Sequence, residues 1–307
     1  MARRKLSSAG HKLGQLIGDW YEEHFVLPLL QEVATRLKLD LDHRFRARSV
    51  RTGDKIIWKD EDENGVDFDF VMELDGTDDV RGIPIAFFEC FWRRGSRHSR
   101  DKVRDDSGKL LPMRDTYPTA RFLGVLASGD VSKPSRAFLL TRDIDVFYVP
   151  KAKIIDAFRE HGLQMDYPDK LPEAQKAQLA NAFQRSLTPV IKQKAAETLR
   201  TLIGQTSIST YVDRVLAALG ALPQELRFIA QHQSKPVVFD SIPEATQFLT
   251  KPVFDFSVLI ENFIYEITYS DGTEFERQVN TLDELRTLHA TIDRLARHVT
   301  AIAAAEH

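Results

Sequence analysis

Three carboxylates on two neighbouring apolar segments are the residues of this sequence best suited to catalysis. Asp67 and Asp69 lie in the segment 66–74, where acidic and aromatic residues alternate, and Glu89 interrupts the apolar run 83–92. A buried carboxylate is costly unless a cation or hydrogen-bond donors surround it. If the two segments are adjacent strands that point carboxylates at one spot, they form an oxygen-lined site that suits Mg²⁺ or Mn²⁺ rather than zinc.

A strongly basic segment follows Glu89. Residues 93–104 carry six basic side chains against one acidic side chain, whereas residues 54–79 carry eleven acidic side chains against two lysines. Basic residues at such density attract a phosphodiester backbone. The side chains predicted to contact phosphates are Arg93, Arg94, Arg97 and Arg100. The alternative is a solvated helix face that forms ion pairs with the acidic region.

Other chemistries lack the residues to carry them. The sequence has no G-x-S-x-G, no G-x-x-x-x-G-K-[ST] and no G-x-G-x-x-G motif, so serine hydrolysis, nucleotide hydrolysis and dinucleotide binding are not indicated. The single cysteine, Cys90, excludes a disulfide framework and a multi-cysteine zinc site. A net charge of −3, from 42 basic and 45 acidic residues, excludes a globally cationic, histone-like protein.

The sequence also bears on the cellular compartment. It contains no run of about 18 apolar residues, so no membrane span is expected. The basic N-terminus lacks the apolar core of a signal peptide, and a lone cysteine is typical of a reducing compartment. We therefore expect a cytoplasmic protein without membrane contact.

The elements that must position the carboxylates begin with a predicted helix over 11–38, where apolar residues recur at three- and four-residue spacing. Pro28 lies inside this segment and should kink or split the helix. Strands are predicted at 44–50, 55–58, 66–74 and 83–92, the last of them buried on both faces of a sheet. A loop and a helix are expected over the basic segment.

The remaining elements complete an α/β fold with a mixed central β-sheet flanked by helices. Strands are predicted at 121–127 and at 137–141 continuing through 145–149, followed by a helix at 151–161. A polar, proline-bearing connection at 166–173 leads to a mainly helical C-terminal region that contains a β-hairpin. The elements predicted there are helices at 173–203 and 209–219, two helices after capping boxes at 241–244 and 281–284, and hairpin strands at 263–269 and 274–279.

Residues 13–150 resemble the PD-(D/E)XK nuclease superfamily, which includes many type II restriction endonucleases. Val66-Asp67-Phe68-Asp69-Phe70-Val71 is similar to the aspartate strand of that family, and Ala86-Phe87-Phe88-Glu89-Cys90-Phe91 is similar to its glutamate strand. The resemblance implies a restriction-endonuclease-like core over residues 1–165. Residues 166–307 would then serve target recognition or dimerisation.

The resemblance implies a Mg²⁺-dependent endonuclease that hydrolyses double-stranded DNA, with Mn²⁺ as a substitute metal and a homodimer to cut both strands. Asp69 and Glu89 would hold the metal ion, with Asp67 as a further ligand, and a catalytic lysine would stabilise the charge on phosphorus. The family has this lysine two positions after the glutamate, where this sequence has Phe91. Lys102 is the first candidate to replace it, ahead of Lys55, Lys59 and Arg93.

Two other functions stay open at this point. The phenylalanine in the lysine position also suits a non-catalytic nucleic-acid-binding protein on a degenerate nuclease fold. The other alternative is a different metal-dependent phosphodiesterase or an RNA-directed nuclease. Incubation with DNA and with RNA, in Mg²⁺ and in EDTA, distinguishes these functions.

Overall fold

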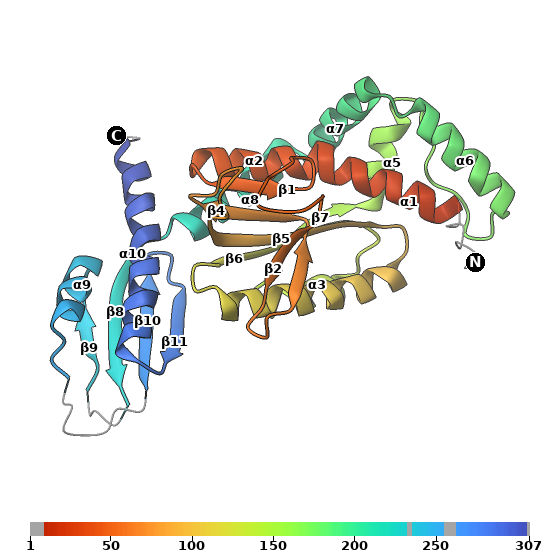
Figure 1. Ribbon diagram of the computed structural model, residues 1–307. Coiled ribbons are helices and arrows are strands. Elements are labelled where there is room, and N and C mark those ends of the chain that lie inside the picture. Colours follow the sequence, from red (N-terminus) through yellow and green to blue (C-terminus); the bar gives the residue numbers. More distant parts are fainter. Residues whose placement is uncertain (1–8, 232–234, 255–261, 306–307) are drawn as a thin grey trace.

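A five-stranded mixed sheet lies at the centre of the computed structural model, which describes residues 9–231, 235–254 and 262–305 (Figure 1). The strand order is β1-β4-β5-β6-β7, in which the β1/β4 and β4/β5 pairs are antiparallel and the β5/β6 and β6/β7 pairs are parallel. The strands are β1 (Asp40–His43), β4 (Phe70–Leu74), β5 (Ile83–Arg93), β6 (Phe122–Gly129) and β7 (Asp145–Pro150). The expected mixed α/β architecture is therefore present.

Helices cover both faces of this sheet and produce two separate apolar cores. Phe88 of the central strand β5 packs in one core with Trp20, and Phe87 and Phe91 of the same strand pack in the other. Because β5 is buried on both faces, its sequence is apolar nearly throughout. The helices of this part are α1 (Ala9–Trp20), α2 (Leu27–Arg36), α3 (Ser96–Thr116), α4 (Lys133–Leu140) and α5 (Lys151–Arg159).

The N-terminal helix changes its geometry just before Pro28. A π-helical turn, η1 (Tyr21–Val26), joins α1 to α2, and Pro28 falls in the first turn of α2. Proline has no N–H to donate and is therefore tolerated in a first helical turn. The disruption predicted at Pro28 thus takes the form of a π turn, which inserts one extra residue into the helix and changes the directions of its side chains.

Three strand predictions were wrong. Residues 44–50 form turns after β1, and residues 137–141 lie in α4 and at its C-terminal end, because Ser132 caps that helix by accepting a hydrogen bond from the amide of Ser135 (3.2 Å). The segment 66–74 is not one strand. It divides at Asp69 into β3 (Gly65–Phe68), which pairs with β2 (Ile56–Lys59) in a separate hairpin, and β4 of the central sheet.

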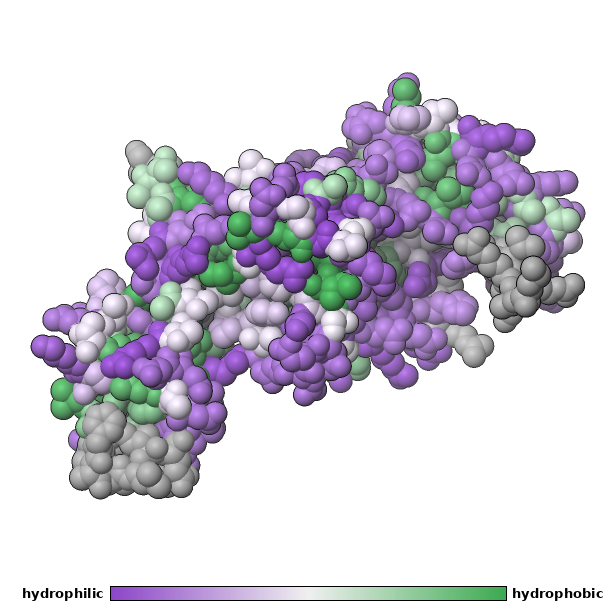
Figure 2. Space-filling view, viewed as in Figure 1, coloured by the Kyte–Doolittle hydropathy of each residue, from purple (hydrophilic) through white to green (hydrophobic). Residues whose placement is uncertain are grey.

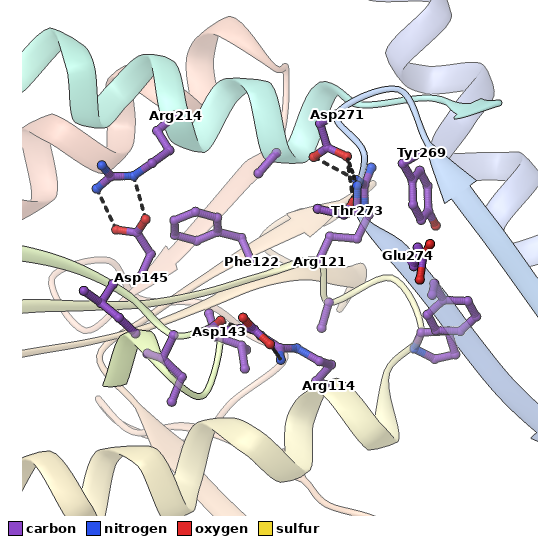
Figure 3. A pocket seen from close by; sticks show the side chains of 17 residues that line it. Arg114, Arg121, Phe122, Asp143, Asp145, Arg214, Tyr269, Asp271, Thr273 and Glu274 are labelled. Atoms are coloured by element: carbon purple, nitrogen blue, oxygen red, sulfur yellow. Dashed lines mark hydrogen bonds and ion pairs between the residues drawn. The ribbon is translucent and has the colours of Figure 1, made fainter. Parts of the chain in front are cut away.

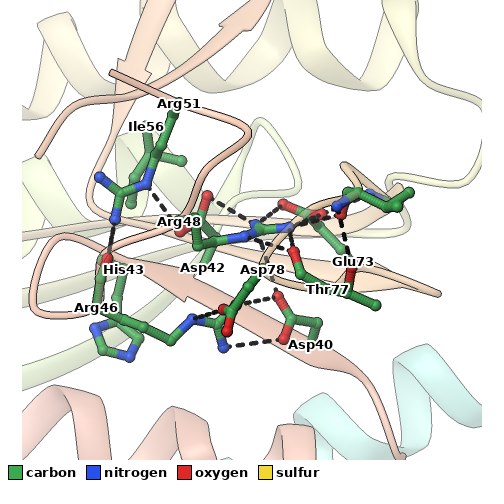
Figure 4. Close-up of polar contacts among 12 residues, drawn as sticks. Asp40, Asp42, His43, Arg46, Arg48, Arg51, Ile56, Glu73, Thr77 and Asp78 are labelled. Carbon is green, nitrogen blue, oxygen red and sulfur yellow. Dashed lines mark hydrogen bonds and ion pairs between the residues drawn. The ribbon is translucent and has the colours of Figure 1, made fainter. Parts of the chain in front are cut away.

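A buried ion network holds the loop after β1 against the sheet edge (Figure 4). The guanidinium of Arg48 is fully buried and pairs with the carboxylates of Glu73 (2.7 Å) and Asp42 (2.9 Å). It also donates to the carbonyl oxygens of Thr77 and Val80 (2.6 and 2.9 Å). Breaking a buried ion pair leaves an uncompensated charge, so this network fixes the loop position.

The three helices after the central sheet pack on the helices that cover it rather than form a separate unit. These helices are α6 (Glu173–Ser186), α7 (Pro189–Ile203) and α8 (Gln205–Gly220). Their residues Phe183, Leu199 and Tyr211 belong to the same apolar core as Trp20. The predicted single helix 173–203 is interrupted between α6 and α7. α6–α8 bury their apolar faces on the N-terminal helices, and most of the apolar residues from 221 onwards pack in a third core.

The C-terminal unit is a four-stranded antiparallel sheet, in the order β11-β10-β8-β9, that packs against two helices (Figure 1). Its elements are β8 (Pro223–Ala230), β9 (Val237–Phe239), α9 (Ile242–Thr250), β10 (Phe263–Tyr269), β11 (Glu274–Val279) and α10 (Leu282–Ala305). The predicted hairpin is confirmed as β10 and β11. Both predicted helix caps are confirmed, because the hydroxyls of Ser241 and Thr281 accept hydrogen bonds from amides in the first helical turns. β8 and β9 were not predicted.

α10 connects the C-terminal unit to the central sheet. Its Arg294 pairs with Asp75 (2.6 Å), and His298 Nε2 bonds the carbonyl oxygen of Leu37 (2.8 Å). Figure 2 shows that hydrophilic residues cover most of the visible face, with hydrophobic residues in small separate areas. Within the described ranges, no helix is long and apolar enough to cross a membrane.

Candidate active site

Glu89 lies at the centre of a group of charged side chains between β5 and α3. Its side chain is 1% exposed, and both of its carboxylate oxygens accept hydrogen bonds from lysines of α3. Lys102 Nζ donates to Oε2 (2.9 Å) and Lys109 Nζ donates to Oε1 (2.9 Å). The buried carboxylate that the sequence singles out is therefore compensated by two cations from one helix.

Asp69 lies beside Glu89, at the point where the chain passes from β3 to β4. Its Oδ2 accepts a hydrogen bond from the amide of Cys90 (2.7 Å). Burial raises the pKa of Asp69 to about 6, with a further contribution from the negative charge of Glu89. The structure thus brings together the two carboxylates that the sequence assigned to one site, and their mutual repulsion is what a divalent cation would relieve.

The structure does not bring Asp67 to this pair. Its carboxylate is 40% exposed, accepts a hydrogen bond from the amide of Ile56 (3.1 Å) and pairs with Lys55 (3.4 Å). Only its backbone reaches the site, because the carbonyl oxygen of Asp67 accepts a bond from Lys109 (2.9 Å). The alternation over 66–74 would place Asp67 and Asp69 on the same face of one strand. This arrangement is lost because the chain leaves the β2–β3 hairpin at Asp69.

Lys102 reaches Glu89 from α3, as the sequence analysis proposed, and Asp106 holds it there. Asp106 is fully buried, and its Oδ1 lies 2.6 Å from Lys102 Nζ. Burial raises the pKa of Asp106, whereas burial lowers the pKa of Lys102 but the charges of Asp106 and Glu89 raise it by more. Lys102 is therefore a protonated ammonium between two buried carboxylates.

Sequence reasoning missed Asp106 and Lys109, although a signal for them exists. Residues 102, 106 and 109 follow the spacing i, i+4, i+7, which places them on one face of a helix. The position of Phe91 explains why the cations that contact Glu89 come from this face of α3. Phe91 packs with Phe87 in the core that α3 covers, so a cation for Glu89 comes from α3 rather than from β5.

Glu22 of the π turn is a further acidic residue of this site that the sequence analysis missed. Its carboxylate is nearly buried and accepts two hydrogen bonds from Arg44, each 2.7 Å long. Burial and the charge of Asp69 raise the pKa of Glu22 to about 8, against the opposing influence of Arg44. No sequence pattern reveals this placement, because it depends on the irregular turn before Pro28.

A cleft of about 1060 Å³ opens onto Asp69, Glu22 and Lys102. The residues that line it include seven acidic and five basic side chains, so its potential is not positive without an added cation. Within the described residues, no group of three or more histidine, cysteine, aspartate or glutamate side chains is arranged to hold a metal ion. The donor chemistry nevertheless fits Mg²⁺ or Mn²⁺, because Asp69 and Glu89 offer only carboxylate oxygens and crowd each other.

The four predicted phosphate-binding arginines have different surroundings. Arg93 lines the cleft and donates to the carbonyl oxygen of Trp92 (3.0 Å), and Arg100 is exposed on α3. Arg94 pairs with Asp169 (2.6 Å), and its guanidinium lies 4.1 Å from the centroid of the Tyr167 ring, so it ties the 166–172 segment to β5. The side chain of Arg97 lies outside the described part of the structure.

The fallback candidates for the catalytic lysine do not reach Glu89. Lys55 pairs with Asp67 (3.4 Å), and Lys59 pairs with Glu63 in the exposed β2–β3 hairpin. Both lysines are more than half exposed. The structure therefore leaves Lys102 and Lys109 as the two lysines in contact with the carboxylate.

A second cavity of about 580 Å³ lies between the central sheet and the C-terminal unit (Figure 3). Three arginines line it, and each faces an aspartate: Arg214 with Asp145 (2.6 Å), Arg114 with Asp143 (3.9 Å) and Arg121 with Asp271 (3.7 Å). Each arginine thus has an acidic partner, and the pair of Arg121 and Asp271 joins the two units, so we assign this cavity to the junction rather than to catalysis.

Comparisons with models of known protein families, with curated proteins and with solved structures found no match for this chain.

Proposed function

We propose that this chain is a divalent-metal-dependent endonuclease that hydrolyses DNA phosphodiester bonds in the cleft next to Asp69. The observation that carries this proposal is that Asp69 and Lys102 line the cleft while both lie against the buried Glu89, which Lys102 contacts directly. Two carboxylates and a protonated lysine are a suitable set of groups for phosphodiester hydrolysis. The resemblance to PD-(D/E)XK nucleases leads to the same activity.

In this proposal, Asp69 and Glu89 would hold the metal ion, which would supply Lewis-acid activation of the phosphate and of the attacking water. Lys102 keeps its proton and places a positive charge next to the phosphate, where negative charge develops in the transition state. Arg93, which lines the cleft, and Arg100, exposed on α3, contact backbone phosphates, which increases affinity without reading sequence.

The C-terminal sheet does not offer a DNA surface on its outer face. Glu266 lies directly opposite Glu276 in the β10–β11 register, and Glu225 and Glu274 lie in the same shallow depression with one basic residue, Arg227. Such a face repels phosphates. Target recognition in a restriction-type enzyme would therefore use other surfaces, and a paired active site would require a second copy of the chain.

The test is cleavage of supercoiled plasmid DNA and of RNA in Mg²⁺, Mn²⁺ and EDTA. We expect metal-dependent cutting of DNA, and loss of that cutting in Glu89→Gln and Asp69→Asn, which remove a metal ligand and keep the side-chain size. Glu276→Gln on the remote sheet is the matched control and should cut at the wild-type rate. Cutting of RNA alone would replace DNA by RNA as the substrate.

A non-catalytic nucleic-acid-binding protein is the second candidate. It is favoured by Phe91 in the usual lysine position and by the lysines that occupy both oxygens of Glu89. In that case neither DNA nor RNA would be cut with any of the metal ions, and EDTA would not change the binding of DNA. Electrophoretic mobility shifts with and without EDTA, run on the same samples, separate the two functions.

A further inference from the structure

The carboxylate of Glu89 has cations at both oxygens in the state that the structure shows. Lys102 and Lys109 each donate to one oxygen at 2.9 Å. A metal ion that bound Glu89 would need at least one of these oxygens, so one lysine would have to leave. The two lysines differ in how firmly they are held.

Lys102 is held by two buried carboxylates. Its ammonium lies 2.9 Å from Glu89 and 2.6 Å from Asp106, and its side chain is 19% exposed. Both partners are buried acids, and contacts between an ammonium and an acid are stronger than hydrogen bonds between neutral groups. If Lys102 left, the buried Asp106 would lose its ion pair.

Lys109 is held less firmly. Among the described residues its one ion pair is with Glu89, its second hydrogen-bond partner is the neutral carbonyl oxygen of Asp67 (2.9 Å), and its side chain is 35% exposed. No buried acid depends on Lys109 in the way that Asp106 depends on Lys102. Its four-carbon stem can carry the ammonium into water without moving α3.

We infer that Lys109 is a built-in counter-ion that occupies the cation position at Glu89 and leaves it when a divalent metal ion binds, whereas Lys102 stays. This inference rests on the proposed function, since it assumes that Glu89 is a metal ligand. Metal and Lys109 then compete for the same oxygen. Lys109 compensates the charge of Glu89 in the metal-free state, and the metal ion does so in the metal-bound state. Because Lys109 competes with the metal ion, it lowers the apparent affinity for metal.

The first experiment uses the unmodified protein and Mn²⁺ alone. Surface amines are acetylated briefly with acetic anhydride, with and without Mn²⁺, and modification at each lysine is measured by peptide mass spectrometry. We expect acetylation of Lys109 to rise on metal addition while Lys102 stays protected. Lys194, exposed on α7, is the reference for reagent activity.

The second experiment is calorimetric titration of Lys109→Met with Mn²⁺. Removal of the competing ammonium should tighten Mn²⁺ binding about tenfold, and the matched variant Lys194→Met should bind as the wild type does. Thermal melts of each variant confirm that it is folded. If Lys109→Met does not fold, the acetylation measurement on the wild type still decides the question.

The outcomes separate this inference from the proposed function. If Mn²⁺ binds the wild type but neither the reactivity of Lys109 nor the affinity of Lys109→Met changes, the inference is wrong and the metal site stands. If Mn²⁺ binds neither the wild type nor Lys109→Met, the proposed metal-dependent function fails and takes the inference with it. Increased acetylation of Lys102 instead would exchange the roles of the two lysines.

Discussion

Charge compensation around Glu89 is the main determinant of the candidate site at the scale of single residues. Three nearly or fully buried acids, Glu22, Glu89 and Asp106, each have a basic partner, and Asp69 has only an amide donor of its own. The raised pKa of Asp69 is the consequence of burial and of the nearby Glu89. Asp69, which lacks an ion pair among the described contacts, therefore opens onto the cleft together with the arginine-paired Glu22.

The role of Lys102 can be tested by comparing Lys102→Ala with Lys102→Arg under single-turnover conditions with saturating enzyme. If Lys102 stabilises the transition state, Lys102→Ala should lower the cleavage rate about a hundredfold or more. Lys102→Arg keeps the charge but not the compact geometry, so we expect partial recovery. A change in DNA affinity at an unaltered cleavage rate would make Lys102 a phosphate contact only.

Two irregular or unusual elements position these residues. The π turn before Pro28 directs Glu22 towards Asp69, and α3 presents Lys102, Asp106 and Lys109 on the face that covers β5. α1 also carries three glycines along the cleft, at positions 10, 14 and 18. Glycine inside a helix is destabilising relative to alanine, so these positions weaken the element that forms one wall of the cleft.

Gly14→Ala provides a direct measurement of that cost. A Cβ at Gly14 would meet no atom within 4 Å, so no steric penalty opposes the gain in helix propensity. We expect the free energy of unfolding to rise by about 0.5–1 kcal/mol, measured by urea denaturation. Gly10→Ala is the contrasting variant, because its Cβ would lie 2.7 Å from the Tyr167 hydroxyl. Equal effects of the two changes would contradict the described packing of α1.

At the scale of the whole molecule, two units with different cores are joined by α10 and by the ion pairs of the junction. The tryptophans Trp20, Trp58 and Trp92 all belong to the central-sheet unit. The C-terminal unit contains the buried His289, whose Nε2 and Nδ1 lie 2.8 Å from Thr246 Oγ1 and 2.9 Å from the Tyr265 hydroxyl. Since Thr246 donates its own hydrogen to Ile242, Nε2 must donate to Thr246 and Nδ1 must accept from Tyr265.

This neutral histidine makes the C-terminal unit sensitive to acid. Burial lowers the pKa of His289 below its ordinary value, so the unfolded chain takes up the proton first as the pH falls. The contribution of neutral His289 to the free energy of unfolding is complete above about pH 6.5, which is the pKa of histidine in the unfolded chain. This contribution is lost progressively as the pH falls below that value. Circular dichroism melts at pH 8 and pH 5 should show this loss, and tryptophan fluorescence should report less of it.

His289→Gln is the control for that pH dependence. Glutamine can keep one hydrogen bond and cannot be protonated in this range, so the difference between the pH 8 and pH 5 melting temperatures of the C-terminal unit should shrink. An unchanged difference would assign the acid sensitivity to another group. His43, whose pKa burial also lowers, lies in the central-sheet unit and would appear in the fluorescence melt instead.

The sequence by itself determined the features that depend on local pattern. An apolar run broken only by Glu89 was enough for the central strand β5, and Ser-Asp-Gly-Thr between two strand-like segments was enough for the β10–β11 hairpin. The capping boxes were recognised because a hydroxyl and the amide three residues later interact within one turn. Asp69 and Glu89 stood out because a carboxylate inside an apolar strand requires a partner.

Only the tertiary structure decided which partners those carboxylates have. Lys109 lies 20 residues after Glu89 and Glu22 lies 47 residues before Asp69, and no local pattern carries information over such separations. Asp67 was misplaced because strand periodicity does not show that the chain changes sheets at Asp69. α4 and β1 were misplaced because short apolar runs suit either a helix or a strand until a cap or a neighbouring strand pairs with them. Which charged groups lie next to Glu89 is therefore decided by the packing of α3 on the sheet, and cannot be read from any one segment of the sequence.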